Sequence, residues 1–234
     1  MYYIGTSGYY YKNWVGDFYP SDMPKYRYLE YYIKFFNSLE LNSTFYRFPK
    51  ITTIKNWKYK IKNNFRISIK ANRIITHTKK LNCNKNYLNE FLETVNTLSN
   101  KLGVILFQLP PSLKYDLNKL EDFISKLKVN LKYAIEFRNQ NWYNDNIYEI
   151  LKKHNIALVW HDFNGEFIFE KTADFEYVRF HGYSGKYKGS YPDEILEDII
   201  KRLNNNVFVY FNNTDDNSAF RDAMRFKKLI EEKK

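Results

Sequence analysis

Short apolar segments alternate with longer mixed segments along almost the whole chain. Eight of the short segments have the length of strands, and they cover residues 2–5, 39–42, 65–70, 104–108, 134–138, 157–162, 177–181 and 207–212. Because a tight turn cannot join two parallel strands, strands that alternate with helices predict a parallel sheet. The pattern therefore predicts one (β/α)8 barrel of the TIM type, formed by residues 1–234 as a single domain.

Most of the connecting segments carry apolar residues at helical spacing. One face of residues 87–100, for example, carries Leu88, Leu92 and Val95. The predicted helices cover residues 26–37, 49–62, 87–100, 118–129, 144–154, 192–205 and 216–231. Residues 163–174 lack such a repeat, so we predict that the sixth crossover is degenerate.

The predicted strands end in polar residues, most of them in pairs two positions apart. These residues are Glu40 and Asn42, Lys70 and Asn72, Gln108, Glu136 and Arg138, His161 and Asp162, Arg179 and His181, and Tyr210 and Asn212. Residues two apart point to the same side of a strand. In barrels of this type, the functional site lies at the C-terminal ends of the strands. We therefore predict that these side chains surround one cavity.

The charge of the chain is +11 and is unevenly distributed. No acidic residue lies between Glu40 and Glu90, where about five would be expected at the average frequency. The same interval holds twelve cations: Arg47, Lys50, Lys55, Lys58, Lys60, Lys62, Arg66, Lys70, Arg73, Lys79, Lys80 and Lys85. A region of one sign attracts anions, so a partner would be nucleic acid, a phosphorylated metabolite or an acidic surface. The alternative is a solvated, lysine-rich helix surface.

Cysteine content and hydropathy exclude several classes of protein. Cys83 is the only cysteine, so the chain forms no internal disulfide, and we expect this thiol to be a passive loop residue. No apolar run approaches the length of a membrane span, and the N-terminal residues do not resemble a secretory signal. We expect a soluble, cytoplasmic protein.

Several local motifs together resemble the YecE-like family, also called domain of unknown function 72. They are WVGDFYP at 14–20, ELNSTFY at 40–46, Lys70 with ITH at 75–77, QLPP at 108–111, EFR at 136–138 with Trp142, RFHG at 179–182 and YFNN at 210–213. The resemblance covers nearly the whole chain and implies a TIM barrel without implying a particular activity. The sequence TDDNSA at 214–219 departs from the usual pattern, which leaves the role of the last loop open.

The carboxylates and cations at the strand ends are candidates for acid-base chemistry. Glu136 and Arg138 share one face of one strand, and a carboxylate beside an arginine keeps a low pKa. Glu136 is therefore expected to be an acceptor, an orienting group or a base. Glu40 has no cation near it in the sequence and is the better candidate for a general acid. The alternative is a buried ion-pair network that joins the strands.

Three of the four histidines, His77, His161 and His181, lie at or just after strand ends. Together with the carboxylates they offer ligands for a divalent metal. No two histidines have chelating spacing, and the neighbouring cations would repel a metal ion. We therefore expect no cofactor and assign these histidines to hydrogen bonding or proton transfer. His154, late in a helix, is expected to be structural.

An anionic group has several candidate partners near the strand ends. Arginine binds phosphate with a two-pronged fork and lysine binds it as a point charge, which suits the side chains of Lys70, Arg138, Arg179 and Lys186. The loops after the seventh and eighth strands are the usual phosphate site of this fold. Aromatic faces for a base or sugar would come from Trp14, Tyr46, Trp142 and Trp160, although core packing is the alternative for each. The aromatic loop 6–25 is a candidate lid.

These features favour an enzyme that hydrolyses a phosphoester of a small molecule or a nucleic acid. The candidate catalytic residues are Glu40, Glu136 and His181. The candidate substrate-binding residues are Asn42, Tyr46, Lys70, His77, Gln108, Arg138, Trp142, Asp162, Arg179 and Asn212. Two alternatives remain open: a metal-independent isomerase or lyase that uses the same groups, and a nucleic-acid-binding module without catalysis.

Overall fold

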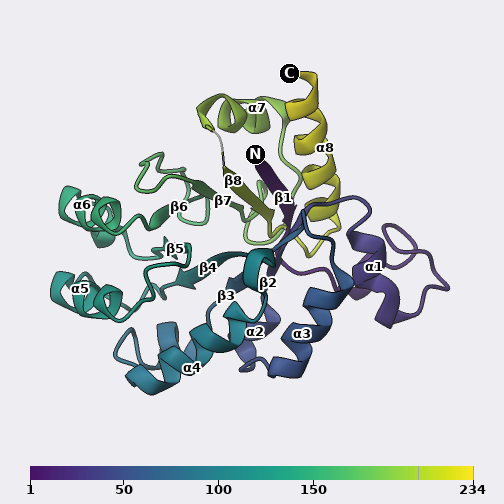
Figure 1. The fold of residues 1–234 in the computed structure, drawn as a ribbon. Coiled ribbons are helices and arrows are strands. Elements are labelled where there is room, and N and C mark those ends of the chain that lie inside the picture. The colour runs from purple at the N-terminus through teal and green to yellow at the C-terminus, as the bar shows by residue number, and fades with distance from the viewer. Residues whose placement is uncertain (205, 234) are drawn as a thin grey trace.

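Eight parallel strands form a nearly closed barrel in the computed structural model, which describes residues 1–204 and 206–233 (Figure 1). The strands are β1 (Tyr2–Thr6), β2 (Ser38–Leu41), β3 (Arg66–Lys70), β4 (Leu102–Gln108), β5 (Tyr133–Glu136), β6 (Ala157–His161), β7 (Glu176–Phe180) and β8 (Val207–Phe211). Their order around the sheet is β1-β8-β7-β6-β5-β4-β3-β2. β1 and β2 meet near the mouth, where Gly8 N donates to Glu40 O over 2.7 Å. The predicted fold is confirmed.

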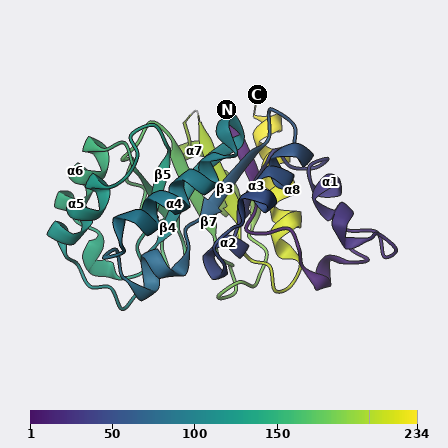
Figure 2. The same ribbon diagram turned by 60° about the horizontal axis from the view of Figure 1, so that its bottom comes forward.

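Helices surround the strands on the outside of the barrel (Figure 1 and Figure 2). They are α1 (Tyr28–Tyr32), α2 (Ser43–Tyr46), α3 (Ile51–Lys60), α4 (Lys85–Asn96), α5 (Leu117–Ser125), α6 (Asp145–Lys153), α7 (Asp193–Arg202) and α8 (Ser218–Glu232). The short helical turns are η1 (Lys12–Trp14), η2 (Lys25–Arg27), η3 (Ile74–Thr78), η4 (Ser99–Lys101) and η5 (Gln140–Trp142). Residue 205, the last of the predicted helix 192–205, lies outside the described residues. None of the helices in the described part of the chain is long and apolar enough to cross a membrane.

The first helix is shorter than its apolar pattern predicts. α1 ends at Tyr32, and the chain then turns toward β2. Asn37, at the end of this turn, accepts a hydrogen bond from Ile4 N over 2.8 Å and donates one to Tyr2 O over 2.8 Å. An amide side chain thus satisfies backbone groups of β1, which lies at the seam of the barrel.

The sixth crossover has no helix in the structure, as its sequence predicts. Residues 162–175, between β6 and β7, are turns and irregular backbone. Thr172 replaces part of the missing packing, since its hydroxyl accepts from Leu158 N over 2.7 Å and donates to Ile156 O over 2.6 Å. This irregular segment leaves space on the outside of the barrel, where a helix would otherwise lie.

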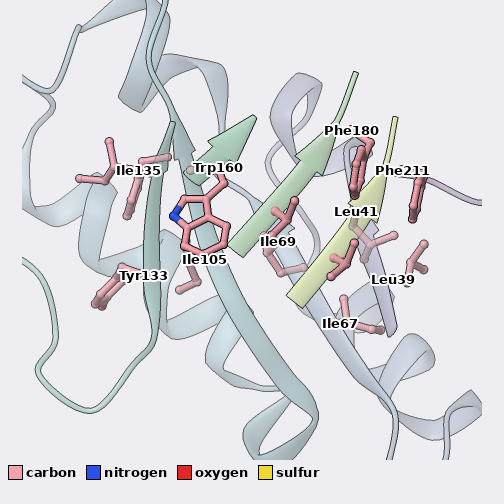
Figure 3. Close-up of a cluster of buried hydrophobic side chains, with 14 of the residues drawn as sticks. Leu39, Leu41, Ile67, Ile69, Ile105, Tyr133, Ile135, Trp160, Phe180 and Phe211 are labelled. Carbon is pink, nitrogen blue, oxygen red and sulfur yellow. The ribbon is translucent and has the colours of Figure 1, made fainter. Parts of the chain in front are cut away.

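Alternate residues of β4 face two different hydrophobic clusters. Ile105 and Phe107 of β4 pack with helix residues such as Leu92, whereas Val104 and Leu106 belong to a separate cluster inside the barrel. Figure 3 shows part of the outer cluster, which includes Leu39, Leu41, Ile67, Ile69, Ile105, Tyr133, Ile135, Trp160, Phe180 and Phe211. Polar groups therefore replace this apolar filling toward the C-terminal ends of the strands.

The aromatic loop after β1 belongs to the core, and the expectation of a lid is wrong. Trp14 and Tyr19 are buried, and Trp14 lies 5.2 Å from the ring of Phe220 in α8. Tyr19 stacks on Tyr28 with 4.0 Å between ring centroids. Aromatic residues in this loop pack against helices because the loop folds outward over α1 and α8.

Candidate functional site

Polar side chains form two levels at the C-terminal end of the barrel. The lower level, which we call the lower tier, consists of Ser7, Glu40, Glu136, Tyr177 and Arg179. The upper tier consists of Asn42, Lys70, Gln108, Arg138, His181 and Asn212. The spacing explains three pairs, Glu40 and Asn42, Glu136 and Arg138, and Arg179 and His181, because a residue two positions further along a strand lies one step closer to the mouth on the same face. Tyr177 comes two positions before Arg179 and joins the lower tier because its long side chain reaches Glu40.

The lower tier is a closed network centred on Arg179. Its Nη1 donates to Glu136 Oε2 over 2.6 Å, and its Nη2 donates to Glu40 Oε1 over 2.8 Å. Tyr177 donates to Glu40 Oε2 over 2.6 Å, and Ser7 donates to the other oxygen of the same carboxylate. Glu40, Glu136 and Arg179 have 0% exposed surface. This network joins β1, β2, β5 and β7 across the barrel.

Charge balance makes the buried network possible. Burial alone would raise the pKa of Glu136, but Arg138 and Arg179 outweigh burial and hold this pKa well below its ordinary value. Burial alone would lower the pKa of Arg179, but Glu40 and Glu136 raise it above its ordinary value. Glu136 and Arg179 are therefore ionised, and their charges compensate each other.

The partners of Glu40 remove the reason for preferring it as a general acid. No cation is near it in the sequence, yet Arg179 contacts it from β7, 139 residues away. With no exposed surface, Glu40 cannot touch a ligand in this arrangement, and the same holds for Arg179 as a direct anion ligand. Both residues lie beneath the mouth in a buried ion-pair network. This is the alternative role that the sequence left open.

His181 lies between Arg138 and Asn212 in the upper tier. Its Nε2 is 3.3 Å from Arg138 Nη2, and its Nδ1 is 3.1 Å from Asn212 Nδ2. Burial lowers the pKa of His181 well below its ordinary value, although Glu136 acts in the opposite direction. The ring is therefore neutral at neutral pH. Arginine only donates hydrogen bonds, so the contact with Arg138 favours the tautomer with a free lone pair on Nε2 and the proton on Nδ1. Asn212 then pairs with that proton only when its amide is turned so that Oδ1, not Nδ2, faces the ring.

Asp162 fixes the backbone of His181 and has no free carboxylate oxygen. Oδ1 accepts from His181 N over 2.8 Å, and Oδ2 accepts from the hydroxyl of Tyr191. The same hydroxyl accepts from Gly182 N over 2.5 Å. Burial raises the pKa of Asp162 despite these hydrogen bonds. We therefore regard Asp162 as a positioning residue, not a ligand of substrate.

Lys70 is the cation of the upper tier that has no carboxylate partner. Among the described residues, no hydrogen bond or ion pair involves its ammonium, which lies 4.5 Å from the ring centroid of Phe45. Burial, followed by the charge of Arg179, lowers the pKa of Lys70 to about 7. Nearby, Asn42 Oδ1 is buried without a hydrogen-bond partner.

A cavity of about 320 Å³ lies above these two residues, and it is lined by Tyr11, Asn42, Phe45, Tyr46, Lys70, Tyr187, Asn212, Thr214 and Asp215. Tyr46 stands at its rim with 70% of its surface exposed. The cavity thus combines an ammonium group, an unsatisfied amide oxygen and several hydroxyl groups, which is a polar binding surface of the kind predicted for the mouth.

The other predicted residues take different places. His77 packs its ring against Phe45 at 4.9 Å, and burial together with Lys70 lowers its pKa to about 4. Gln108 lies in the upper tier and donates to Leu109 O over 3.0 Å. Trp142 has no exposed surface, and its indole donates to Leu113 O over 2.9 Å. The structure therefore brings His77 and Gln108 to the mouth but leaves Trp142 in the core.

Two of the other tryptophans considered as stacking faces, Trp14 and Trp160, are also buried. Trp160 donates to Glu170 O over 2.9 Å and packs against Phe169 outside the sheet. Core packing therefore describes these tryptophans better than ligand stacking.

One group of buried residues has the composition of a metal site. Glu136, His161 and His181 each place a possible ligand atom within 4.8 Å of the others. Glu136 is already bound by two arginines, and His161 Nε2 lies 2.9 Å from the Tyr143 hydroxyl and 3.0 Å from Phe137 O. A divalent ion would have to displace these partners beside the guanidinium groups, so the donor set does not suit one.

A second, larger cavity lies beside the upper tier and was missed by sequence reasoning. Its volume is about 610 Å³, and its lining includes Phe163, Phe167, Phe169, Ile195 and His181. The three phenylalanines come from the irregular crossover between β6 and β7. The available signal was a group of aromatic residues in a segment without a helical repeat.

Asp222 is a further residue that sequence reasoning missed. It is buried in α8 and accepts hydrogen bonds from Ser190 Oγ over 2.5 Å, Tyr191 N over 3.2 Å and Asn213 Nδ2 over 2.8 Å. Burial raises its pKa against these bonds. A signal existed, because the acid lies on the same helix face as the buried Ala219.

The unusual sequence after β8 has a structural role. Asp216 accepts a hydrogen bond from Gly189 N over 2.6 Å, and Asp215 N donates to Tyr187 O over 3.1 Å. The loop after β8 therefore holds the loop after β7, which covers His181. Tyr187 adopts a left-handed backbone with φ of 68°, unusual for a residue with a side chain.

Comparisons with known sequences agree with this architecture. The model of the family described as "Protein of unknown function DUF72" matches residues 3–234. The UPF0759 protein YecE of Escherichia coli K12 is 28% identical over 116 residues, which are 49% of this chain and 43% of that protein. The UPF0759 protein YunF of Bacillus subtilis is 25% identical over 99% of this chain and 95% of its own length. The chain thus matches less than half of YecE but nearly all of YunF.

Solved structures give the same result. A DUF72 family protein from Thermotoga maritima has a TM-score of 0.87 and 28% identity, with 99% of both chains covered. A DUF72 family protein from Enterococcus faecalis has a TM-score of 0.84 and 20% identity, which shows the shared fold alone. With a family match over almost its entire length and the barrel expected from its motifs, the chain belongs to the DUF72 family.

Proposed function

We propose that this protein binds a phosphorylated substrate at the mouth of the barrel and hydrolyses its phosphoester. The observation that carries the proposal is the state of Lys70. Its ammonium has no carboxylate partner among the described residues and faces a polar cavity, while the other cations of the two tiers are paired. A charge that the protein does not compensate is a binding site for an anion.

The upper tier also offers groups for proton transfer. A water that replaces Arg138 at Nε2 of the neutral His181 gives a proton to that nitrogen as it attacks phosphorus. The ammonium of Lys70 gives a proton to the leaving oxygen when the phosphorus–oxygen ester bond breaks. A pKa of about 7 makes Lys70 a better proton donor at neutral pH than an ordinary lysine. Arg138, which is 8% exposed, supplies positive charge to the phosphoryl oxygens.

A second candidate function is nucleic-acid binding without catalysis. Arg47, Lys50, Lys55, Arg73 and Lys79 are exposed and form no ion pair among the described residues. These cations follow β2 and β3, on the side of the mouth that holds Lys70. Such a surface would hold phosphate backbones with strong salt dependence.

The test combines binding and turnover. Calorimetry at low ionic strength should detect inorganic phosphate, and Lys70→Met should weaken this binding at least about tenfold, as expected when one charge-assisted contact is lost. Release of inorganic phosphate from phosphomonoesters, and of the alcohol from phosphodiesters, measures the reaction. Lys79→Met, which removes an exposed lysine of the same basic segment, is the matched control and should change neither result.

The outcomes separate the alternatives. Activity that persists in a chelator agrees with a reaction that uses no metal ion, whereas loss of activity in a chelator contradicts this mechanism. Phosphate binding without hydrolysis of any ester contradicts the hydrolase and favours the isomerase or lyase. Retention on DNA or RNA that disappears at high salt, and that Lys70→Met leaves unchanged, favours the binding module.

A further inference from the structure

The 610 Å³ cavity exists because the sixth crossover lacks a helix. In a regular unit, a helix between β6 and β7 would cover the outside of these strands. Here the irregular segment supplies Phe163, Phe167 and Phe169, and α7 supplies Ile195 and Ile199 from the opposite side. The volume lies in the range of small-molecule sites, which are largely apolar with a few polar groups.

Flat aromatic surfaces dominate one wall of this cavity. Phe167 and Phe169 lie nearly parallel, with 12° between their planes and 5.9 Å between their centroids. Phe163 stands closer to the mouth, 5.4 Å from the ring of His181. Walls of this kind favour a planar ring, which gains stacking contacts as well as burial.

The cavity is a neighbour of the site proposed above, with His181 and Asn212 at the boundary between the two. His181 lines the aromatic cavity, Asn212 lines the cavity of Lys70, and these two residues are 3.1 Å apart. A ligand that crosses this pair has one part in each cavity. Tyr187 lies over the crossing point, 6.1 Å from the ring of His181.

The two ends of the aromatic cavity differ in the charged residues that lie beside them. At the inner end, the Arg138 guanidinium lies 3.3 Å from the centroid of Phe163, and Lys186 lies 4.6 Å from the same ring. At the outer end, Asp198 is paired with Arg202 over 3.0 Å. Among the described residues, Lys186 forms no ion pair and lies on the mouth side, where the anionic part of a ligand would lie. Glu166 is a further acidic residue of the lining.

We infer that the substrate carries a flat aromatic group, a nucleobase or an aryl ring, which occupies the cavity between the sixth crossover and α7 while its phosphate lies at Lys70 and Arg138. This inference rests on the proposed function for the position of the phosphate. The aromatic group itself is assigned from the walls, the volume and the position of the cavity beside His181.

Calorimetry with three simple anions tests the inference. Phenyl phosphate should bind at least about tenfold more tightly than methyl phosphate, because the ring removes apolar surface from water. The variant Ile195→Trp, which fills the cavity from a partly exposed position, should bring this ratio close to one. It should leave the affinity for inorganic phosphate unchanged. Val129→Trp, at a fully exposed position after α5, is the matched control and should preserve the ratio.

Two further measurements keep the test decisive. Indole, an uncharged aromatic probe, should bind the wild type and not Ile195→Trp, which tests the cavity even if phosphate does not bind. If Ile195→Trp fails to fold, Phe167→Leu provides a second test of the aromatic wall. It should lower the preference for phenyl phosphate over methyl phosphate. Comparing adenosine monophosphate with ribose 5-phosphate then distinguishes a nucleobase from an aryl ring.

The results point in clear directions. Equal affinities for phenyl and methyl phosphate in the wild type, together with measurable binding of inorganic phosphate, overturn the inference and leave the proposed function intact. Failure of inorganic phosphate to bind, with indole still bound in the cavity, overturns the proposed function and leaves the aromatic site.

Discussion

The lower and upper tiers of the mouth contain similar residue types on the same strands, yet their surroundings differ. Glu136 and Arg179 in the lower tier bind each other with no exposed surface. Two positions further along, His181 lines the larger cavity, and Arg138 lies 3.3 Å from the ring of His181 while it remains paired with Glu136. The comparison shows that one step along a strand separates charges that hold the barrel together from charges that are available to a ligand.

The largest expected effect is on stability, and it comes from the lower tier. Arg179→Met leaves Glu40 and Glu136 buried without their shared cation, so the free energy of unfolding should fall by about 3–5 kcal/mol. Urea unfolding measures this loss. A loss below about 1 kcal/mol would mean that the two tiers do not differ in the way described.

A smaller effect should separate activity from stability in the upper tier. His181→Gln removes the neutral base but keeps a polar side chain, so phosphoester hydrolysis should fall about 100-fold while urea unfolding changes little. The measurement is phosphate release beside an unfolding curve for the same preparation. Unchanged hydrolysis would assign His181 to positioning.

The smallest effect concerns Lys70 and has a defined pH dependence. Its folded pKa of about 7 lies below the unfolded value of 10.5, so the unfolded chain binds more protons between these values and stability rises with pH across this window. Lys70→Met removes this dependence and should stabilise the protein by about 1 kcal/mol at pH 7. The gain should vanish near pH 11. Destabilisation at pH 7 would show that the ammonium is well solvated or paired.

The strand pattern and the polar strand ends could be predicted because both depend on local spacing. The pairs Glu136–Arg138 and Arg179–His181 were visible two residues apart, and the barrel brings them together as expected. The contact between Arg179 and Glu40 could not be predicted, because it depends on where the sheet closes.

The errors have a common physical origin. Trp142 follows a strand end, as a mouth residue would, but η5 turns its indole back to Leu113 O. The aromatic cavity was missed because it occupies the space of a missing helix. The sequence pattern indicates that the helix is absent, but it does not predict whether side chains fill the space. Phe163 and Phe167 were present in the sequence, but their common wall depends on the fold of an irregular segment.

The charge balance of the lower tier has a consequence for the kind of ester that the mouth accepts. Across the two tiers, the charges of Glu40, Glu136, Arg138 and Arg179 sum to zero, so Lys70 is the one cation of the tiers that a ligand can match, in a cavity that Asp215 also lines. A phosphodiester carries a single negative charge, whereas a phosphomonoester carries nearly two at neutral pH. One lysine neutralises the former completely. The latter requires a second cation, and the exposed Lys186, on a loop that is tied to the segment after β8, is the nearest candidate in the architecture described.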